Sequence, residues 1–401
     1  MIGWPWWAWL WCAVSFAAEQ PSTTAAAETR TVQTAIVPLV NFTTDRGLGY
    51  GGYGAVFYMG PDGPGDAPYR MQLGTQWYRT TGGYQDHKLV LDLPTLADGL
   101  VRAELHLGWE RWDDAHYFGQ GNRLPRLRPS ETPHRFYAFG IDSVRSAATV
   151  QVNVGGNWSI AVGHLARTAT IAVYPGSLLD GERPVGLEGG LLSQGSVGVV
   201  HDSRDHEAAP TSGGWSEISL RVAGTALGSR WAMWGGNLTD RRYWSLGSPR
   251  LVLASRQAVD VQRGDVPFFH QIVMGGSRWV DIGGPLAMRG LPIGRYRGEW
   301  TIYADAELRW EASGFQIGRG HYRLFFVPFV SGARIVEPGE GDNAFRPHGG
   351  MGLGTRLLFN DVFQARLDVA MGREEYRTDR AKAAVERAWI PGVYLAFNAP
   401  Y

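Results

Sequence analysis

The segment Glu299–Glu311 reads EWTIYADAELRWE, and its alternation of side chains decides the fold class. Its even-numbered residues, from Trp300 to Trp310, are all apolar, whereas most odd-numbered residues are charged or polar. A period of two places the two sets on opposite faces of a β-strand. The segment Val362–Glu374 alternates in the same way. The sequence therefore predicts strands with one apolar face and one charged face.

From Val32 onward, segments of roughly ten residues repeat this pattern between turn residues, as transmembrane β-strands do. We predict sixteen strands, at 32–42, 50–59, 69–80, 83–93, 100–112, 134–153, 158–174, 194–202, 214–225, 229–243, 249–262, 298–311, 321–335, 349–359, 362–373 and 388–398. The long gaps all follow odd-numbered strands: 113–133, 175–193, 263–297, 336–348 and 374–387. Most other gaps are short.

Long loops at one end and short turns at the other are typical of a bacterial outer-membrane barrel. A soluble β-sandwich also alternates, but it has no reason to sort its loops in this way. We therefore predict an all-β fold, a sixteen-stranded antiparallel transmembrane β-barrel in the bacterial outer membrane. Aromatic residues near strand ends are expected to form girdles at the membrane interfaces. These are Trp77, Tyr78, Trp109, Trp112, Trp300 and Trp310.

Composition excludes several functional classes. The 401 residues include 38 basic and 38 acidic side chains, so the net charge is zero. A nucleic-acid partner is therefore not expected, because phosphate binding relies on a basic surplus. The mean hydropathy of -0.19 is too polar for a bundle of membrane helices. Outer-membrane lipid is the expected surrounding of the barrel.

The first eighteen residues form an apolar run that ends in small residues, which predicts a signal peptide at 1–18 despite the missing positive charge at its start. A buried N-terminal helix or a membrane anchor is the alternative. Residues 19–31 are polar and read as a short periplasmic linker, and the barrel takes 32–401. The single cysteine, Cys12, lies in the predicted signal peptide, so the mature chain would have neither disulfides nor cysteine catalysis.

One gap between strands is dense in glycine and arginine: residues 283–298 read GGPLAMRGLPIGRYRG. Glycine gives the backbone freedom, while Arg289, Arg295 and Arg297 carry fixed charges that need carboxylates or water. The gap is long enough for its loop to turn back into the barrel. On the other inward faces, Arg309, Arg366 and Asp368 are expected to solvate the lumen.

Several short motifs occur in a fixed order along the chain. They are Tyr117–Asn122 (YFGQGN), Val199–Asp205 (VVHDSRD), Pro210–Trp215 (PTSGGW), Val266–Phe269 (VPFF), Gly275–Gly276, Met288–Leu291 (MRGL), Gly350–Gly354 (GMGLG) and Arg366–Asp368. Together they resemble the barrel of BamA/TamA-type outer-membrane proteins, the bacterial surface antigen superfamily. The resemblance is clearest from about 195 to 373. Each motif is short and common alone, and the combination is specific because of its order and spacing.

The resemblance implies that the long outer loop folds into the lumen. Its motif corresponds to Met288, Arg289, Gly290 and Leu291, and the arginine is implied to meet acidic or aromatic groups of the inner wall. Where the family usually has Phe-Val-Asp-Ala-Gly, residues 329–333 read FVSGA, with Ser331 at the acidic position. We therefore expect Asp305 or Glu307, on the inward face of the strand at 298–311, to anchor Arg289 instead.

The segment Asp202, Ser203, Arg204 and Asp205 resembles the Asp-x-Arg-Asp turn of the family. With neighbouring histidines it could be read as a metal site. A turn whose side chains bind one another is favoured, because metal ligands need a defined geometry that hairpin turns rarely provide. No nucleophile elbow surrounds Ser203, so we expect no catalytic residue, no metal and no cofactor.

The resemblance implies a role in outer-membrane biogenesis, the insertion or translocation of protein or lipid through a seam between the first and last strands. In the last strand, Pro391 removes a backbone donor and Gly392 loosens packing, so both are expected at a weak lateral seam. Family members that assemble proteins carry folded periplasmic repeats before the barrel. The linker at 19–31 is too short for one, so a separate periplasmic partner is expected. The alternative is a passive pore or a structural surface barrel plugged by the arginine loop.

Overall fold

The computed structural model describes residues 31–60, 69–121, 126–207, 209–318, 320–337, 347–359, 363–377 and 385–398. The predicted signal peptide at 1–18 and almost all of the predicted linker lie outside these ranges. In this described part of the chain, no helix has the length and apolar character needed to cross a membrane.

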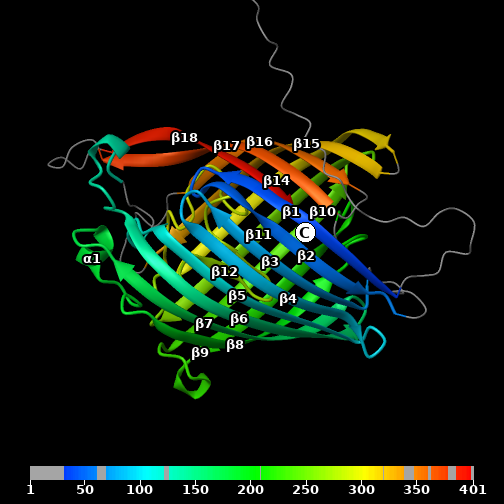
Figure 1. The fold of residues 1–401 in the computed structure, drawn as a ribbon, viewed down its shortest axis with the longest axis horizontal. Helices are drawn as coiled ribbons and strands as arrows, with labels where there is room; N and C mark the ends of the chain where they lie inside the picture. The colour runs from blue at the N-terminus through cyan, green and yellow to red at the C-terminus, as the bar shows by residue number, and fades with distance from the viewer. Residues whose placement is uncertain are drawn as a thin grey trace, which may run out of the picture.

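Sixteen antiparallel strands close into a barrel, which confirms the predicted fold class (Figure 1). They are β1 (Val32–Thr43), β2 (Gly47–Tyr58), β3 (Met71–Thr80), β4 (Tyr84–Leu96), β5 (Val101–His116), β6 (Ala138–Gly155), β7 (Trp158–Val173), β8 (Gly190–Asp202), β9 (Gly213–Ala223), β10 (Met233–Ser245), β11 (Leu251–Gly264), β14 (Trp300–Ile317), β15 (Gly320–Val336), β16 (His348–Phe359), β17 (Phe363–Arg377) and β18 (Val385–Asn398). Each strand pairs with its sequence neighbour, except that β11 pairs directly with β14. Between those two, β12 (Val273–Gly275) and β13 (Trp279–Asp281) form a separate hairpin.

The period of two sorts side chains between lipid and lumen. On β14, Trp300 and Ile302 are exposed on the outside, whereas Thr301 and Tyr303 are buried inside. Large apolar side chains cover the outer wall, with Ile36 83% exposed as an extreme case. Because lipid replaces water around the barrel, the packed core lies in the lumen and is built largely from the long loop.

The predicted aromatic girdle is correct only in part. Trp77, Trp300 and Trp310 are exposed on the outer wall. Tyr78 and Trp112 are instead buried among residues of the lumen. Both residues occupy positions of β3 and β5 whose side chains point into the lumen. The alternation along a strand decides which face a side chain occupies, whether or not it is aromatic.

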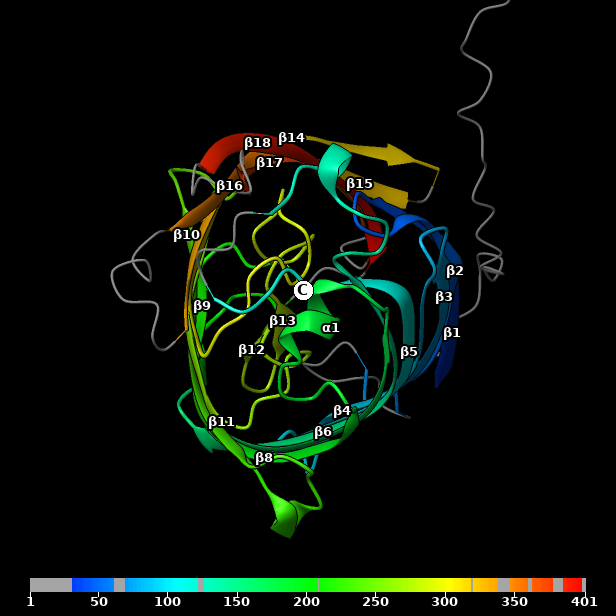
Figure 2. The same ribbon diagram turned by 90° about the vertical axis from the view of Figure 1, so that its left-hand side faces the viewer.

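Loops cover the odd-strand end of the barrel. The connection from β5 to β6 contains η1 (Pro129–Glu131), the connection from β7 to β8 contains α1 (Leu178–Glu182), and a loop at 265–299 joins β11 to β14. They pack on one another: the Leu178 amide donates to the Phe136 carbonyl over 2.7 Å, and the Phe268 amide donates to the Val185 carbonyl over 2.9 Å. Figure 2 shows β12 and β13 of the long loop inside the ring of strands. One shorter connection, β9 to β10, holds η2 (Thr225–Leu227).

Most connections at the other end are short turns, as predicted. The connection at 59–70, between β2 and β3, is an exception to this sorting. β14 and β15 also extend further than the predicted strands at 298–311 and 321–335, because their hairpin continues past a register shift between Glu311 and Ser313.

Candidate functional site

The loop at 265–299 turns back into the lumen, and most of its motif is buried. Met288 and Leu291 each expose 1% of their surface. The backbone turns sharply there: Met288 and Gly290 have positive φ angles of 55° and 98°, and the Leu291 amide donates to the Met288 carbonyl over 3.1 Å. A Cβ at Gly290 would lie 2.3 Å from the Gly372 nitrogen of β17, so only glycine fits against that strand.

Arg289 binds two carboxylates of the inner wall. Its Nη2 lies 2.8 Å from Glu307 Oε1 on β14, and its Nη1 lies 3.1 Å from Asp368 Oδ2 on β17. The guanidinium also lies 3.4 Å from the centroid of the Phe329 ring. Burial acts to lower the pKa of Arg289, but the two carboxylates outweigh it and raise that pKa above its usual value. The side chain therefore stays charged.

Asp368 accepts hydrogen bonds from three arginines and has no exposed surface. Besides Arg289, Arg356 donates to its Oδ1, and Arg366 Nε donates to its Oδ2 over 2.7 Å. The sequence had indicated only that Arg366 and Asp368 solvate the lumen. The structure places both in the network that holds the loop, and Arg366 additionally donates to the Pro285 carbonyl over 2.7 Å.

Of the two carboxylates expected to anchor Arg289, Asp305 is wrong, because it pairs with Arg256 instead. Arg256 on β11 stands directly opposite Asp305 on β14, and its Nε lies 3.2 Å from the carboxylate. The strand register therefore places Arg256 next to Asp305, and this carboxylate binds Arg256 rather than Arg289 of the loop. Ser331, where the resemblance had implied an acidic residue, is buried, and its hydroxyl donates to the Gly350 carbonyl over 3.4 Å.

The two other arginines of the loop are buried as well. Arg295 Nε lies 2.8 Å from Glu374 Oε1, and Arg126 from the β5–β6 connection lies 3.5 Å from the same carboxylate. Arg297 donates to three backbone carbonyls, including that of Phe268 over 3.2 Å. Burial lowers the pKa of Arg297 to about 10. Glu374 therefore ties two loops together through their arginines.

A second set of contacts holds the β12–β13 hairpin at its tip. Ser277 donates to the buried Glu217 of β9 twice, over 2.7 Å from its backbone amide and 2.6 Å from its hydroxyl. A Cβ at Gly276 would lie 1.9 Å from Glu217 Oε1, which explains glycine at the tip. The Gly275 amide donates to Asp260 of β11 over 3.0 Å, and Arg221 donates to the same carboxylate.

The hairpin tip reaches the opposite end of the barrel from the one where its loop begins. Arg278 lies 3.1 Å from Glu207, in the turn between β8 and β9, and Arg102 lies 3.2 Å from the same carboxylate. Since β8 and β11 end at opposite rims, the loop runs through the lumen. Glu217, Asp260 and Glu374 were not predicted as loop anchors from the sequence. The alternation of each strand indicates that these three side chains point into the lumen. It does not indicate which of them the loop contacts.

The side chains of the predicted turn motif bind other groups of the same turn, as expected. Arg204 Nε lies 2.9 Å from Asp202 Oδ1. Asp205 accepts from the backbone amides of Thr211 over 2.9 Å and Ser212 over 3.2 Å. Among the residues that the structure describes, no group of three or more His, Cys, Asp or Glu side chains could hold a metal ion.

The barrel closes through a short seam between β1 and β18. These strands pair at two positions, Phe42 with Leu395 and Thr43 with Tyr394. By contrast, β1 pairs with β2 along its whole length. The predicted seam residues lie on β18, where Pro391 is exposed and Gly392 is buried.

The loop contacts both sides of the seam. On the β18 side, the Gly290 amide donates to the Tyr394 hydroxyl over 3.0 Å. A Cβ at Gly392 would lie 3.1 Å from the Gly290 Cα, so glycine there admits the loop. On the β1 side, the Ile293 amide donates to Asp45 Oδ2, in the turn between β1 and β2, over 3.2 Å. The loop segment Gly290–Ile293 thus bridges the last strand and the turn that follows the first strand.

Residues 120–280 match the model of the Omp85 superfamily domain. Among solved structures, BamA from Haemophilus ducreyi lacking POTRA domains 1-3 is 15% identical with a TM-score of 0.57, over 91% of this chain and 70% of that one. CdiB from Escherichia coli is 12% identical with a TM-score of 0.56, over 93% of this chain and 64% of that one. The chain thus spans about two thirds of the length of these two. At such identities the likeness shows the fold. A comparison with curated proteins finds no match.

Proposed function

We propose that this protein, a BamA/TamA-type barrel of the Omp85 superfamily in the bacterial outer membrane, acts in outer-membrane biogenesis. It opens between β1 and β18 to admit a strand of a client protein or a lipid. The observation that supports this function is the short seam. β1 and β18 pair at two positions, and the Val393 amide donates to the Thr44 hydroxyl beside them. By contrast, β1 pairs with β2 along its whole length. The function requires no catalytic residue, metal or cofactor.

The edge of β1 provides the acceptor surface. Residues 32–41 of β1 have no partner in the described part of β18, although β2 satisfies their other edge. Lipid cannot hydrogen-bond these backbone groups, so leaving them unpaired is costly. An incoming extended strand would satisfy them by adding to the sheet edge. This gives a client strand a reason to bind at the seam.

The loop motif acts as the closing element in this proposal. The contact of Gly290 with Tyr394, together with that of the neighbouring Ile293 with Asp45, holds the last strand next to the turn that follows the first strand. Opening of the seam would break at least one of them. A separate periplasmic partner that delivers the client remains part of the proposal, and the turn that carries Asp202, Arg204 and Asp205 lies at the rim it would approach.

The test is the composition of the outer membrane after depletion of the protein. Proteomics and lipid analysis should show the loss of particular barrels or lipids, restored by the wild-type gene supplied in trans. A profile that does not change on depletion would contradict a role in biogenesis.

A passive pore or structural barrel is the second candidate, favoured by the buried anchors that keep the loop in the lumen. Arg289, Arg295 and Ser277 hold the loop at three separate places. A plug of this kind predicts that planar-bilayer conductance of the purified protein rises when its anchors are removed. An unchanged membrane profile together with such a rise would favour the pore over the assembly function.

A further inference from the structure

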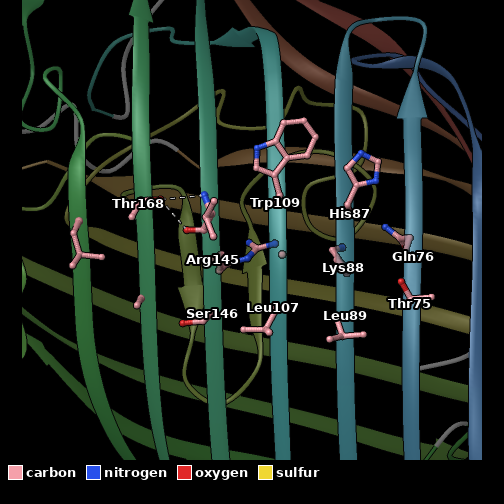
Figure 3. Close-up of a pocket in the computed structure, with 14 residues that line it drawn as sticks. Thr75, Gln76, His87, Lys88, Leu89, Leu107, Trp109, Arg145, Ser146 and Thr168 are labelled. Carbon is pink, nitrogen blue, oxygen red and sulfur yellow. Dashed lines mark hydrogen bonds between the residues drawn. The ribbon is translucent and has the colours of Figure 1, made fainter.

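The outer wall of the barrel has a hollow of about 600 Å³ across β3 to β8 (Figure 3). Its floor and walls include Thr75, Leu89, Leu107, Val144, Ala166 and Leu191. The register explains the hollow: Leu107 stands beside Ser146, and Ser146 beside Ala166, so two small side chains follow a leucine across neighbouring strands. Elsewhere the same face of β7 carries larger side chains, such as Val162.

Stacked rings border the hollow toward the loop-covered end. His87 and Trp109 are parallel within 1° with ring centroids 5.2 Å apart, and Trp77 stacks on His87 at 5.9 Å. Figure 3 shows His87 and Trp109 side by side, above Leu89 and Leu107. Aromatic side chains on an outer wall mark the interface between hydrocarbon and headgroups. The hollow therefore opens to the hydrocarbon just below that interface.

Two arginines follow the rings on the same outward face. Arg79 pairs in register with Gln85, and Gln85 with Arg111, so the three stand in one row across β3, β4 and β5. Each is two residues beyond its ring-bearing neighbour, a rise of roughly 7 Å along a strand. Arg79 has no ion pair within the described residues, and Arg111 pairs only with the exposed Asp113 over 3.0 Å. Both guanidiniums have donors to spare.

We propose that this wall binds a phosphate-bearing lipid, with an acyl chain in the hollow and the phosphate at Arg79 and Arg111. Along the strands, the apolar hollow is followed by the stacked rings and then by the arginine row. This is the order of acyl chain, interface and phosphate in such a lipid. The arginine-to-hollow distance, roughly 13 Å over four strand residues, fits the path from a phosphate to the upper acyl chain. Guanidinium groups match phosphate oxygens in pairs. The site lies on β3 to β8, away from the β1–β18 seam, and is independent of lateral opening.

The test compares two lipids that share their acyl chains and differ in the phosphate. The full-length protein is purified in detergent, incubated with phosphatidic acid or the matching diacylglycerol, and analysed by native mass spectrometry. The wild type should retain phosphatidic acid in preference to diacylglycerol. Arg79→Ala and Arg111→Ala should each lower its retention about fivefold. Arg373→Ala, which removes an exposed outward arginine on β17, is the control and should change nothing.

A second pair of variants tests the hollow. Ala166→Phe fills it and should lower the retention of both lipids, whereas Ala148→Phe, on the same outer wall but outside the hollow, should not. Resistance of the folded band to sample-buffer detergent confirms that each variant has folded. Equal retention of the two lipids, or arginine variants that retain phosphatidic acid like the wild type, would overturn the proposal. So would a lipid-free dimer that Ala166→Phe abolishes, because a second copy would then occupy the hollow.

Discussion

Arg289 Nη1 and Asp368 Oδ2 lie 3.1 Å apart in the lumen, although 79 positions separate the two residues in the chain. Asp368 belongs to β17, which pairs along its length with the seam strand β18. The loop is therefore fixed to the strand beside the seam as well as to β18 itself. A movement of the β17–β18 pair away from β1 can carry the loop with it, which breaks the loop's contact with Asp45. If the loop stays in place, its contacts with Asp368 and Tyr394 break instead.

The first prediction is that Asp368→Ala destabilises the barrel more than Arg289→Ala does. Loss of Asp368 leaves the buried guanidiniums of Arg289 and Arg356, and the partly buried one of Arg366, without their shared carboxylate. We expect this to lower the free energy of unfolding by about 3–5 kcal/mol. Loss of Arg289 costs less, because Asp368 keeps Arg356 and Arg366. The free energy of unfolding in urea with lipid vesicles measures both. An Arg289→Ala variant that is the less stable of the two would contradict this network.

A double-mutant cycle separates the two expected partners of Arg289. The coupling energy between Arg289→Ala and Glu307→Ala should be about 1–3 kcal/mol, because a charged hydrogen bond joins these residues. The coupling with Asp305→Ala should stay below about 0.5 kcal/mol, since Asp305 is bound to Arg256. Equal couplings would show that Arg289 does not bind Glu307 in preference to Asp305.

The second prediction concerns the two ends of the plug. Arg289→Ala alone should raise bilayer conductance little, because Ser277 still holds the hairpin tip at Glu217. The double variant Arg289→Ala with Glu217→Ala should raise it clearly further. Glu311→Ala is the matched control, since that carboxylate pairs with Arg323 of the neighbouring strand. A full increase from Arg289→Ala alone would mean that the hairpin does not obstruct the lumen.

The third prediction is a pH dependence that originates in the turn between β8 and β9. Partial burial acts to raise the pKa of Asp205, but the hydrogen bonds from Thr211, Ser212 and His206 outweigh it and lower the pKa from 3.8 to about 2. A lowered folded-state pKa contributes stability that is present above pH 3.8 and is lost as the pH falls toward 2.

The stability difference between the wild type and Asp205→Asn should therefore be constant from neutral pH down to about pH 5 and shrink below about pH 4. Thermal unfolding followed by circular dichroism across this range measures it. A difference that grows with acidification would have the wrong sign for a carboxylate stabilised in its charged form.

Much of the fold could be predicted because lipid imposes a strict period of two on each strand. Alternation from Trp300 to Trp310 and the sorting of loop lengths were enough for sixteen strands and for the place of the arginine loop. The same parity also identified Glu307 as an inward carboxylate. The β12 and β13 strands have three residues each, too few for a period to show.

The contacts of the loop could not be predicted in the same way. Asp305 and Glu307 share one face of β14, and only the register of β11, which sets Arg256 opposite Asp305, decides between them. Asp368 was recognised as an inward charge, but its contact with Arg289 depends on how far the loop reaches across the barrel. Such distances follow from the closed three-dimensional arrangement and leave no local pattern in the sequence.

The most direct test of the central claim, that the β1–β18 seam opens in function, is an engineered cross-link across it. Phe42→Cys with Leu395→Cys would join a directly paired position, and Leu353→Cys with Val369→Cys would join the fully paired β16 and β17 as a control. Both are expressed in depleted cells, and outer-membrane composition is measured with and without reductant. If the seam opens, the oxidised seam variant should fail to restore the membrane, reductant should rescue it, and the control should restore the membrane throughout. Full restoration by the oxidised seam variant would contradict opening at the seam.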